Sequence, residues 1–177
     1  MQKNLFHFQA QYPVVESSAY IAPTASIIGD VNIKENSSIW FGVVARGDVA
    51  KIKIGASTNI QDNTVIHVTK NGFNTYIGNY VTIGHQCLIH ASTLEDKCFV
   101  GMGSIIMDEA RVESNGWLAA GSLLTAGKIV KSGELWAGSP AKFFRKLTAE
   151  EQKFIMISAQ NYVELAKKYM LNLSDCR

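Results

Sequence analysis

Three of the chain's four histidines lie close together in the sequence, and two occupy matched positions in a repeating pattern. His67 directly follows Ile66, and His90 directly follows Ile89. The two isoleucines are 23 residues apart, and an inserted loop of five residues after Ile66 leaves three units of six. If three such units form one coil, the two histidines stack on adjacent coils about 5 Å apart. Imidazoles at that spacing can share a metal ion such as Zn²⁺.

The third histidine, His85, has a different phase in the repeat. It lies two residues after Ile83, one unit earlier, and so falls near another edge of the coil. A second subunit related by threefold symmetry would bring its own His85 to the pair, and a set of three histidines leaves a metal position open for water. For each histidine alone, the alternative is an ordinary surface residue. His7 lies outside the repeat and receives no role.

The element that must position these side chains is the repeat itself. Aliphatic residues recur every six positions, with a slip of three residues after Ala45, the inserted loop, and one skipped residue before Leu94. A helix would show a period of 3.6 and a half-buried strand a period of two, whereas a period of six suits very short strands separated by corners. Three units would make a triangular coil, and stacked coils an all-β solenoid. The series comprises Ile21, Ile27, Ile33, Ile39, Ala45, Ile54, Ile60, Ile66, Ile77, Ile83, Ile89, Leu94, Val100, Ile106, Val112, Leu118, Leu124, Val130 and Trp136.

The pattern indicates a single domain in three parts. We expect an N-terminal cap over residues 1–20, a β-helix over 21–141 and a C-terminal α-helix over 148–170. Thr148 and Glu151 have the spacing of a capping box at the start of that helix. Its apolar stripe should pack along the solenoid or against a neighbouring subunit. The stripe contains Ile155, Ala159, Tyr162, Ala166 and Tyr169.

Composition narrows the function classes. The 177 residues are 47% hydrophobic and 18% charged with a net charge of +2, which is typical of a folded globular chain and gives no reason to expect a nucleic-acid partner. No apolar run reaches the length of a membrane span, and the N-terminus has no signal-peptide pattern. The cysteines Cys87, Cys98 and Cys176 are odd in number and far apart, which favours free thiols in a reducing, cytoplasmic compartment.

Several segments together resemble the gamma-class carbonic anhydrases, a family of hexapeptide-repeat proteins. The resemblance covers nearly the whole chain. It implies a left-handed parallel β-helix that assembles as a homotrimer with three metal sites at its interfaces. His67 and His90 would come from one subunit and His85 from the next. The matching segments are Arg46-Gly47-Asp48, Asn59-Ile60-Gln61-Asp62, Val65-Ile66-His67, Gly84-His85 with His90, and Ala137-Gly138-Ser139-Pro140-Ala141-Lys142.

The resemblance also implies roles for residues around the metal. Arg46 and Asp48 match a salt bridge that joins subunits, although the same residues would also suit a simple corner of the coil. Gln61 matches a residue that hydrogen-bonds the metal-bound water or bicarbonate, and Asp62 one that orients Arg46 or accepts a proton.

Two further positions have a structural alternative. Asn59 matches another polar residue near the site, with an asparagine ladder or turn in the coil as the alternative. Tyr162 matches a site tyrosine, with plain packing in the helix stripe as the alternative.

The implied activity is that of a carbonate dehydratase-like lyase, the reversible hydration of CO₂ to bicarbonate by a metal-bound hydroxide. Zn²⁺ is the expected cofactor, with Fe²⁺ or Co²⁺ also compatible with imidazole ligands. The chain departs from efficient members at two places where they carry proton-shuttling acids: Val49 follows Asp48, and the loop 68–75 has no carboxylate. Two alternatives therefore stay open: a thioesterase or acyltransferase acting on acyl-CoA, and a non-catalytic trimeric assembly module.

Overall fold

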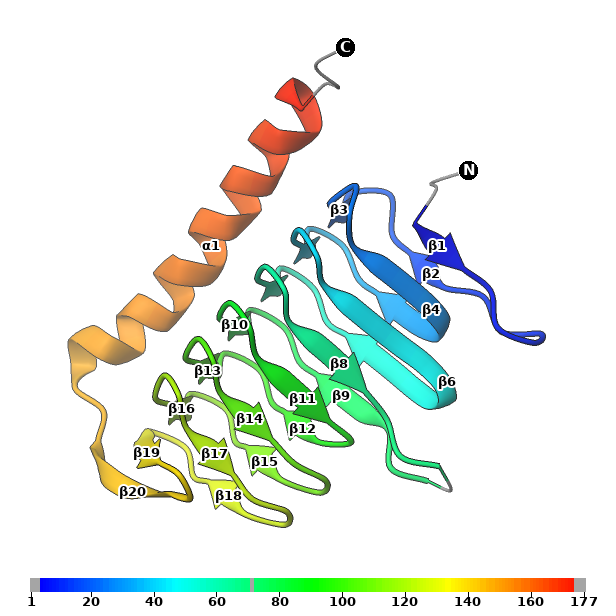
Figure 1. Ribbon diagram of the computed structural model, residues 1–177. Coiled ribbons are helices and arrows are strands. Elements are labelled where there is room, and N and C mark those ends of the chain that lie inside the picture. Colours follow the sequence, from blue (N-terminus) through cyan, green and yellow to red (C-terminus); the bar gives the residue numbers. More distant parts are fainter. Residues whose placement is uncertain (1–3, 71, 174–177) are drawn as a thin grey trace.

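Short parallel strands stack into a three-sided β-helix, and one long helix runs along its side (Figure 1). The computed structural model describes residues 4–70 and 72–173, so Cys176 lies outside the described residues. The predicted solenoid with a C-terminal helix is confirmed. No helix in these two described ranges is both long enough and apolar enough to cross a membrane.

Each side of the solenoid is a ladder of parallel strands, and β4 (Ser26–Ile33) and β6 (Val44–Ile54) bend around a corner to serve two sides. The first side contains β3 (Tyr20–Ile21), β5 (Ser38–Ile39), β7 (Asn59–Ile60), β10 (Thr82–Ile83), β13 (Phe99–Val100), β16 (Trp117–Leu118) and β19 (Glu134–Gly138), closed by antiparallel β20 (Ala141–Lys146). The second contains β1 (Leu5–Phe6), the first halves of β4 and β6, β8 (Val65–His67), β11 (Leu88–His90), β14 (Ile105–Ile106) and β17 (Leu123–Leu124). The third contains β2 (Val14–Val15), the second halves of β4 and β6, β9 (Thr75–Ile77), β12 (Thr93–Leu94), β15 (Arg111–Val112) and β18 (Ile129–Val130).

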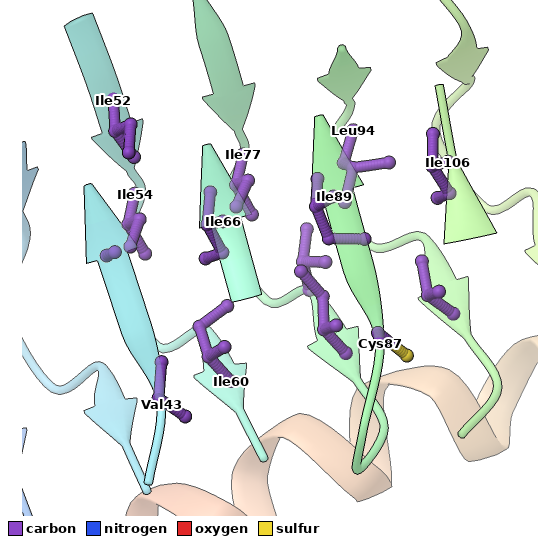
Figure 2. Close-up of a cluster of buried hydrophobic side chains, with 14 of the residues drawn as sticks. Val43, Ile52, Ile54, Ile60, Ile66, Ile77, Cys87, Ile89, Leu94 and Ile106 are labelled. Carbon is purple, nitrogen blue, oxygen red and sulfur yellow. The ribbon is translucent and has the colours of Figure 1, made fainter. Parts of the chain in front are cut away.

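The core is the predicted aliphatic series, stacked coil upon coil inside the triangle (Figure 2). Ile60, Ile66 and Ile89 are fully buried, and the other members from Ile21 to Val130 are buried as well. Trp136, the last member, is only partly buried because the solenoid ends there. Burying a side chain of this size contributes about 2 kcal/mol, so the repeat supplies most of the driving force for folding.

Two irregularities in the repeat shape the second side. The three-residue slip is a bulge in β6: the pairing moves from Gly29 opposite Gly47 to Val31 opposite Ile52, so β6 carries extra residues at this corner. The inserted loop follows β8 and closes on itself through a bridge between Thr69 and Phe73. Both irregularities lie beside the ends of β8 and β11.

The helix α1 (Ala149–Asn172) begins at the predicted capping box, in which Thr148 and Glu151 exchange side-chain and backbone hydrogen bonds. It packs along the first side of the solenoid, which is one of the two arrangements predicted from its apolar stripe (Figure 1). Its buried residues include Ile155, Ala159 and Ala166, and Tyr162 and Tyr169 contact Trp40 edge-on.

The outward positions of the three sides differ in character. The helix covers the first side. On the third side the outward row is mainly polar: Asn32, Lys53, Tyr76, Thr93, Arg111 and Ile129. On the second side the row begins with Ser26 and continues with apolar side chains only: Val44, Val65, Leu88, Ile105 and Leu123. Val65, Leu88 and Ile105 are more than a third exposed, so this side presents an uncovered apolar row.

Candidate metal centre

His67 and His90 lie side by side at the ends of β8 and β11, as their matched phase predicts. They are direct partners in the ladder, next to the pair Ile66 and Ile89. The ring centroids are 5.3 Å apart, and Nδ1 of His67 lies 3.3 Å from Nε2 of His90. Two imidazole nitrogens therefore converge on one point at the surface of the second side.

Each of these histidines is held on its far nitrogen by a carboxylate. Nε2 of His67 lies 3.1 Å from Oδ1 of Asp48, and Nδ1 of His90 lies 2.7 Å from Oδ1 of Asp108. A carboxylate accepts but cannot donate, so each far nitrogen carries the hydrogen and each near nitrogen presents a lone pair. Histidine ligands of metals characteristically donate their other N–H to a carboxylate in this way. The pair therefore fits a divalent metal ion.

Asp48 reaches His67 because it lies in the bulge of β6. Its second oxygen is ion-paired with Arg46 of the same strand. Burial alone would raise the pKa of Asp48, but hydrogen bonds from Arg46 and His67 hold that pKa below its usual value. Within the chain, Arg46 and Asp48 pair with each other because residues two apart on one strand point to the same side. The bridge between subunits that the resemblance implied stays a prediction.

Asp108 belongs to the site but was not among the predicted residues. It lies 18 residues after His90, in the corner after β14, and one residue past the position opposite His90, because Ile89 pairs with Ile106 only 17 residues later. The coil arithmetic that paired His67 with His90 places Met107, not Asp108, opposite His90. An aspartate in a solenoid corner usually accepts hydrogen bonds from the backbone of its own turn, so its residue type alone did not indicate a role in the metal site either.

His85 lies apart from this pair, in the corner before β11, while His90 lies at the strand's end. Its Nδ1 is 2.9 Å from Oδ2 of Asp62, which leaves Nε2 as the nitrogen free of that contact. Within the chain, Asp62 therefore pairs with His85, and its implied role beside Arg46 or as a proton acceptor stays a prediction. Across the described ranges 4–70 and 72–173, no three His, Cys, Asp or Glu side chains gather closely enough to hold a metal within one chain.

The corner that carries His85 depends on the residue before it. A Cβ at Gly84 would lie 2.5 Å from the backbone nitrogen of Met102 in the next coil. Only glycine permits this close stacking, and Gly84 N also donates to Val100 O at 2.9 Å. The position of His85 is therefore fixed by the backbone.

Gln61 and Asn59 lie in a buried chain of hydrogen bonds that reaches α1. Gln61 Nε2 donates to Asn59 Oδ1 at 3.0 Å, and Asn59 Nδ2 donates to Thr82 Oγ1 at 2.9 Å. Thr82 and Ser158 of α1 share a further bond of 3.2 Å between their hydroxyl oxygens. Asn59 therefore supports both the coil and the amide of Gln61, whose carbonyl oxygen points away from this bond.

Tyr162 packs from α1 against Trp40, close enough to Asp62 to sense its charge. Burial first, and the negative charge of Asp62 second, raise the pKa of the Tyr162 hydroxyl. Packing explains its position in this chain. Cys87 is buried in the core, where desolvation raises the pKa of its thiol to about 11. A buried, protonated thiol does not join the histidines as a metal ligand.

Solved structures share this architecture closely. A hexapeptide transferase family protein from Anaplasma phagocytophilum is 56% identical, with a TM-score of 0.92 over 96% of this chain and 99% of that one. A Bacillus cereus protein of 38% identity aligns with a TM-score of 0.89 over 93% of this chain and 95% of that one. A search of protein-family models finds no match.

Curated relatives carry a functional name. Gamma carbonic anhydrase 2, mitochondrial, of Arabidopsis thaliana is 50% identical over 160 residues, covering 88% of this chain. This chain spans only 58% of that relative's length and 59% of gamma carbonic anhydrase 1 from the same plant. A carbonic anhydrase from Geobacillus kaustophilus is 38% identical over 165 residues, which cover 93% of this chain and 90% of the relative. With identity of this order over nearly its whole length, the chain belongs to the gamma carbonic anhydrase family.

Proposed function

We propose that this chain is a metal-dependent carbonic anhydrase-like enzyme that reversibly hydrates CO₂ to bicarbonate at sites shared between the subunits of a homotrimer. The observation that carries the proposal is the converging pair of His67 and His90, each held by its own carboxylate. The relatives named carbonic anhydrase support the same reaction.

The distribution of the side chains supports a site between subunits. His67 and His90 lie at one end of the second side and His85 with Asp62 at the other, and between them runs the uncovered apolar row of Val65, Leu88 and Ile105. A continuous row of exposed apolar side chains is typical of an interface. If the second side packs against a neighbour around a threefold axis, one subunit's His85 meets the next subunit's pair, and all three sites are equivalent.

The residues of this chain would hold and complete the centre. His67 Nδ1, His90 Nε2 and the neighbouring subunit's His85 Nε2 are the proposed ligands, to Zn²⁺ or, with the same donors, Fe²⁺ or Co²⁺. When bound, such an ion lowers the pKa of a coordinated water from 15.7 to about 7, a value known from a carbonic anhydrase of another fold class, and so supplies hydroxide at neutral pH. Asp48, oriented by Arg46, fixes the ring of His67, and Asp62 fixes that of His85.

Gln61 is the proposed positioning group for the reacting oxygen. Because its amide N–H is committed to Asn59, its carbonyl oxygen is the acceptor available to the attacking O–H group. The new C–O bond converts CO₂ to bicarbonate, and the proton of the water passes to buffer. Val49 and the described part of the loop after His67 supply no carboxylate for that transfer.

A second candidate, a thioesterase or acyltransferase, is favoured by one feature. A cavity of about 290 Å³ adjoins Gln61 and is walled by Phe99, Trp117 and Leu135, which suits an apolar acyl group. The solved relative described as a hexapeptide transferase family protein points the same way. Protection of the protein by coenzyme A in thermal melts, with acyl-CoA turnover, would favour this candidate, and a trimer indifferent to His67→Ala in every assay would favour the non-catalytic module.

Stopped-flow CO₂ hydration tests the proposal. We expect turnover by the protein loaded with Zn²⁺ or, anaerobically, Fe²⁺, and reduction of the rate to that of buffer in His67→Ala. His7→Ala is the matched control, because His7 stacks on Tyr12 outside the repeat. Absence of turnover with either metal, at confirmed metal occupancy, would contradict the proposal.

The cytoplasm remains the proposed compartment on the grounds of composition and unpaired thiols. Two of the Arabidopsis relatives carry the word mitochondrial in their names, so location is a separate question from activity. Fractionation of the native cell with an antibody to the chain tests it.

A further inference from the structure

We propose that Asp108, held in place by Thr69, is a positioning residue for the metal centre: it fixes the ring of His90 so that Nε2 faces the metal and adds negative charge beside the cation. The inference rests on the proposed function only in taking His90 as a metal ligand.

The backbone of Asp108 is fixed independently of its side chain. Its carbonyl oxygen accepts from Gly127 N in the following coil at 3.0 Å, and the next residue, Glu109, donates from its N–H to Ala91 O in the preceding coil at 2.8 Å. The corner is therefore clamped between two coils. A rigid corner holds the carboxylate one coil from His90, with Oδ1 at 2.7 Å from Nδ1.

Thr69 fixes the rotation of that carboxylate. Its hydroxyl donates to Oδ2 of Asp108 at 2.5 Å, so both carboxylate oxygens have a defined partner. Thr69 belongs to the inserted loop, two residues after His67. The loop that interrupts the repeat therefore brings the hydroxyl of Thr69 from the coil of His67 to the coil of Asp108, where it donates to the carboxylate.

Asp108 and Asp48 play parallel parts with one difference in charge. Asp48 holds His67 and is itself held by the guanidinium of Arg46, which offsets its charge. Asp108 holds His90 and is held by the neutral hydroxyl of Thr69, and its only salt-bridge partner among residues 4–70 and 72–173 is His90. Within the described ranges, the carboxylate of Asp108 is therefore not offset by a guanidinium, unlike that of Asp48, and it suits a place beside a divalent cation.

If Asp108 had only a structural role, its hydrogen bonds would stabilise the stacking of the coils without affecting metal binding. The variants must distinguish this role from that of a positioning residue. Asp108→Asn keeps the shape and an acceptor oxygen but loses the charge, and Thr69→Val keeps the shape but loses the hydroxyl. Asp96→Asn is the matched control, because Asp96 is also a corner carboxylate but holds Asn79, with its Oδ1 at 2.7 Å from Asn79 N, and no histidine.

The experiment measures Zn²⁺ and Co²⁺ affinity of the oligomer by competition with a chromophoric chelator, together with the visible spectrum of the Co²⁺ form. Asp108→Asn should weaken binding roughly 10- to 100-fold, the usual effect of losing such a partner of a ligand. Thr69→Val should weaken binding less, Thr69→Ser should restore it, and Asp96→Asn should bind like the wild type. The Co²⁺ spectrum should change in Asp108→Asn, while the thermal midpoint of the metal-free protein should move no more than in Asp96→Asn.

Unchanged affinity in Asp108→Asn, or equal weakening in Asp108→Asn and Asp96→Asn, would overturn the inference while leaving the proposed reaction intact. A wild type that binds metal with the expected dependence on Asp108, but does not hydrate CO₂, would contradict the proposed reaction and leave the inference standing. A wild type that binds neither metal would overturn both.

Discussion

The imidazoles of His67 and His90 are held so that two ring nitrogens converge, an arrangement that suits a shared cation. Their carboxylate partners fix both N–H groups on the far side, so two lone pairs face each other across 3.3 Å. A divalent ion bound there would accept one coordinate bond from each ring. The residue-scale evidence for a metal is thus the orientation of the rings, which is stronger than the mere presence of histidines.

At this scale, Gln61 gives a prediction that separates catalysis from metal binding. Gln61→Leu removes the carbonyl acceptor, and the rate of CO₂ hydration should fall by about 10², the usual effect of losing one polar group that stabilises a transition state. Metal content, measured by elemental analysis, should not change. Gln160→Leu, at an exposed position on α1, is the control and should leave the rate unchanged. Loss of metal in Gln61→Leu would show that Gln61 supports the ligands and not the reacting oxygen.

The pairing of His67 with His90 was predictable because both follow a core isoleucine, and the six-residue period converts sequence distance into coil number. The partners of the histidines were not. The contact between His85 and Asp62 depends on two corners in which Asn63 and Gln86 adopt positive φ values near 60°, and spacing alone does not define the path of a corner. Asp108 lies one residue past the position opposite His90 and has the residue type of an ordinary turn, so neither its spacing nor its type identified it.

At the scale of elements, two departures from the repeat build the site. The bulge in β6 carries Asp48 to His67, and the inserted loop after β8 carries Thr69 to Asp108. The helix α1 was predictable from its capping box and apolar stripe. The hydrogen bond between Ser158 of α1 and Thr82, which links the helix to the buried chain of Gln61 and Asn59, was not predictable. Nothing in the sequence around a serine on a helix indicates which residue its hydroxyl will contact.

The start of α1 gives a prediction about pH. Glu151 accepts two bonds of 2.7 Å from Arg145 and one from the backbone of Thr148, and these lower its pKa from 4.5 to about 2. Because the folded pKa is the lower one, the stabilisation is complete above about pH 4.5 and is lost as the pH falls towards 2. Urea unfolding should therefore show wild type more stable than Glu151→Gln at pH 7, with the difference shrinking below pH 4.5. A difference that is constant from pH 7 to pH 3 would contradict this assignment.

At the scale of the whole molecule, each side of the solenoid has its own task. The helix covers the first side, solvent meets the polar third side, and the second side presents an apolar row between His85 and the pair of His67 and His90. The members of this row could be identified from the sequence, because each directly precedes a core aliphatic residue. That the row is uncovered could not be predicted, because it depends on which side of the solenoid α1 packs against. Within the described ranges of one chain, His85 and the pair of His67 and His90 lie too far apart to bind one metal ion together.

Subunit complementation tests this account most directly. His67→Ala and His85→Ala chains, carrying different tags, are co-expressed, the mixed trimers are purified, and their metal content and CO₂ hydration are compared with each parent. If the site is shared, every mixed trimer has one complete site of three, so the purified mixed trimers should have about a third of the wild-type sites, although each parent has none. Mixed trimers with no more metal or activity than either parent would contradict the shared site.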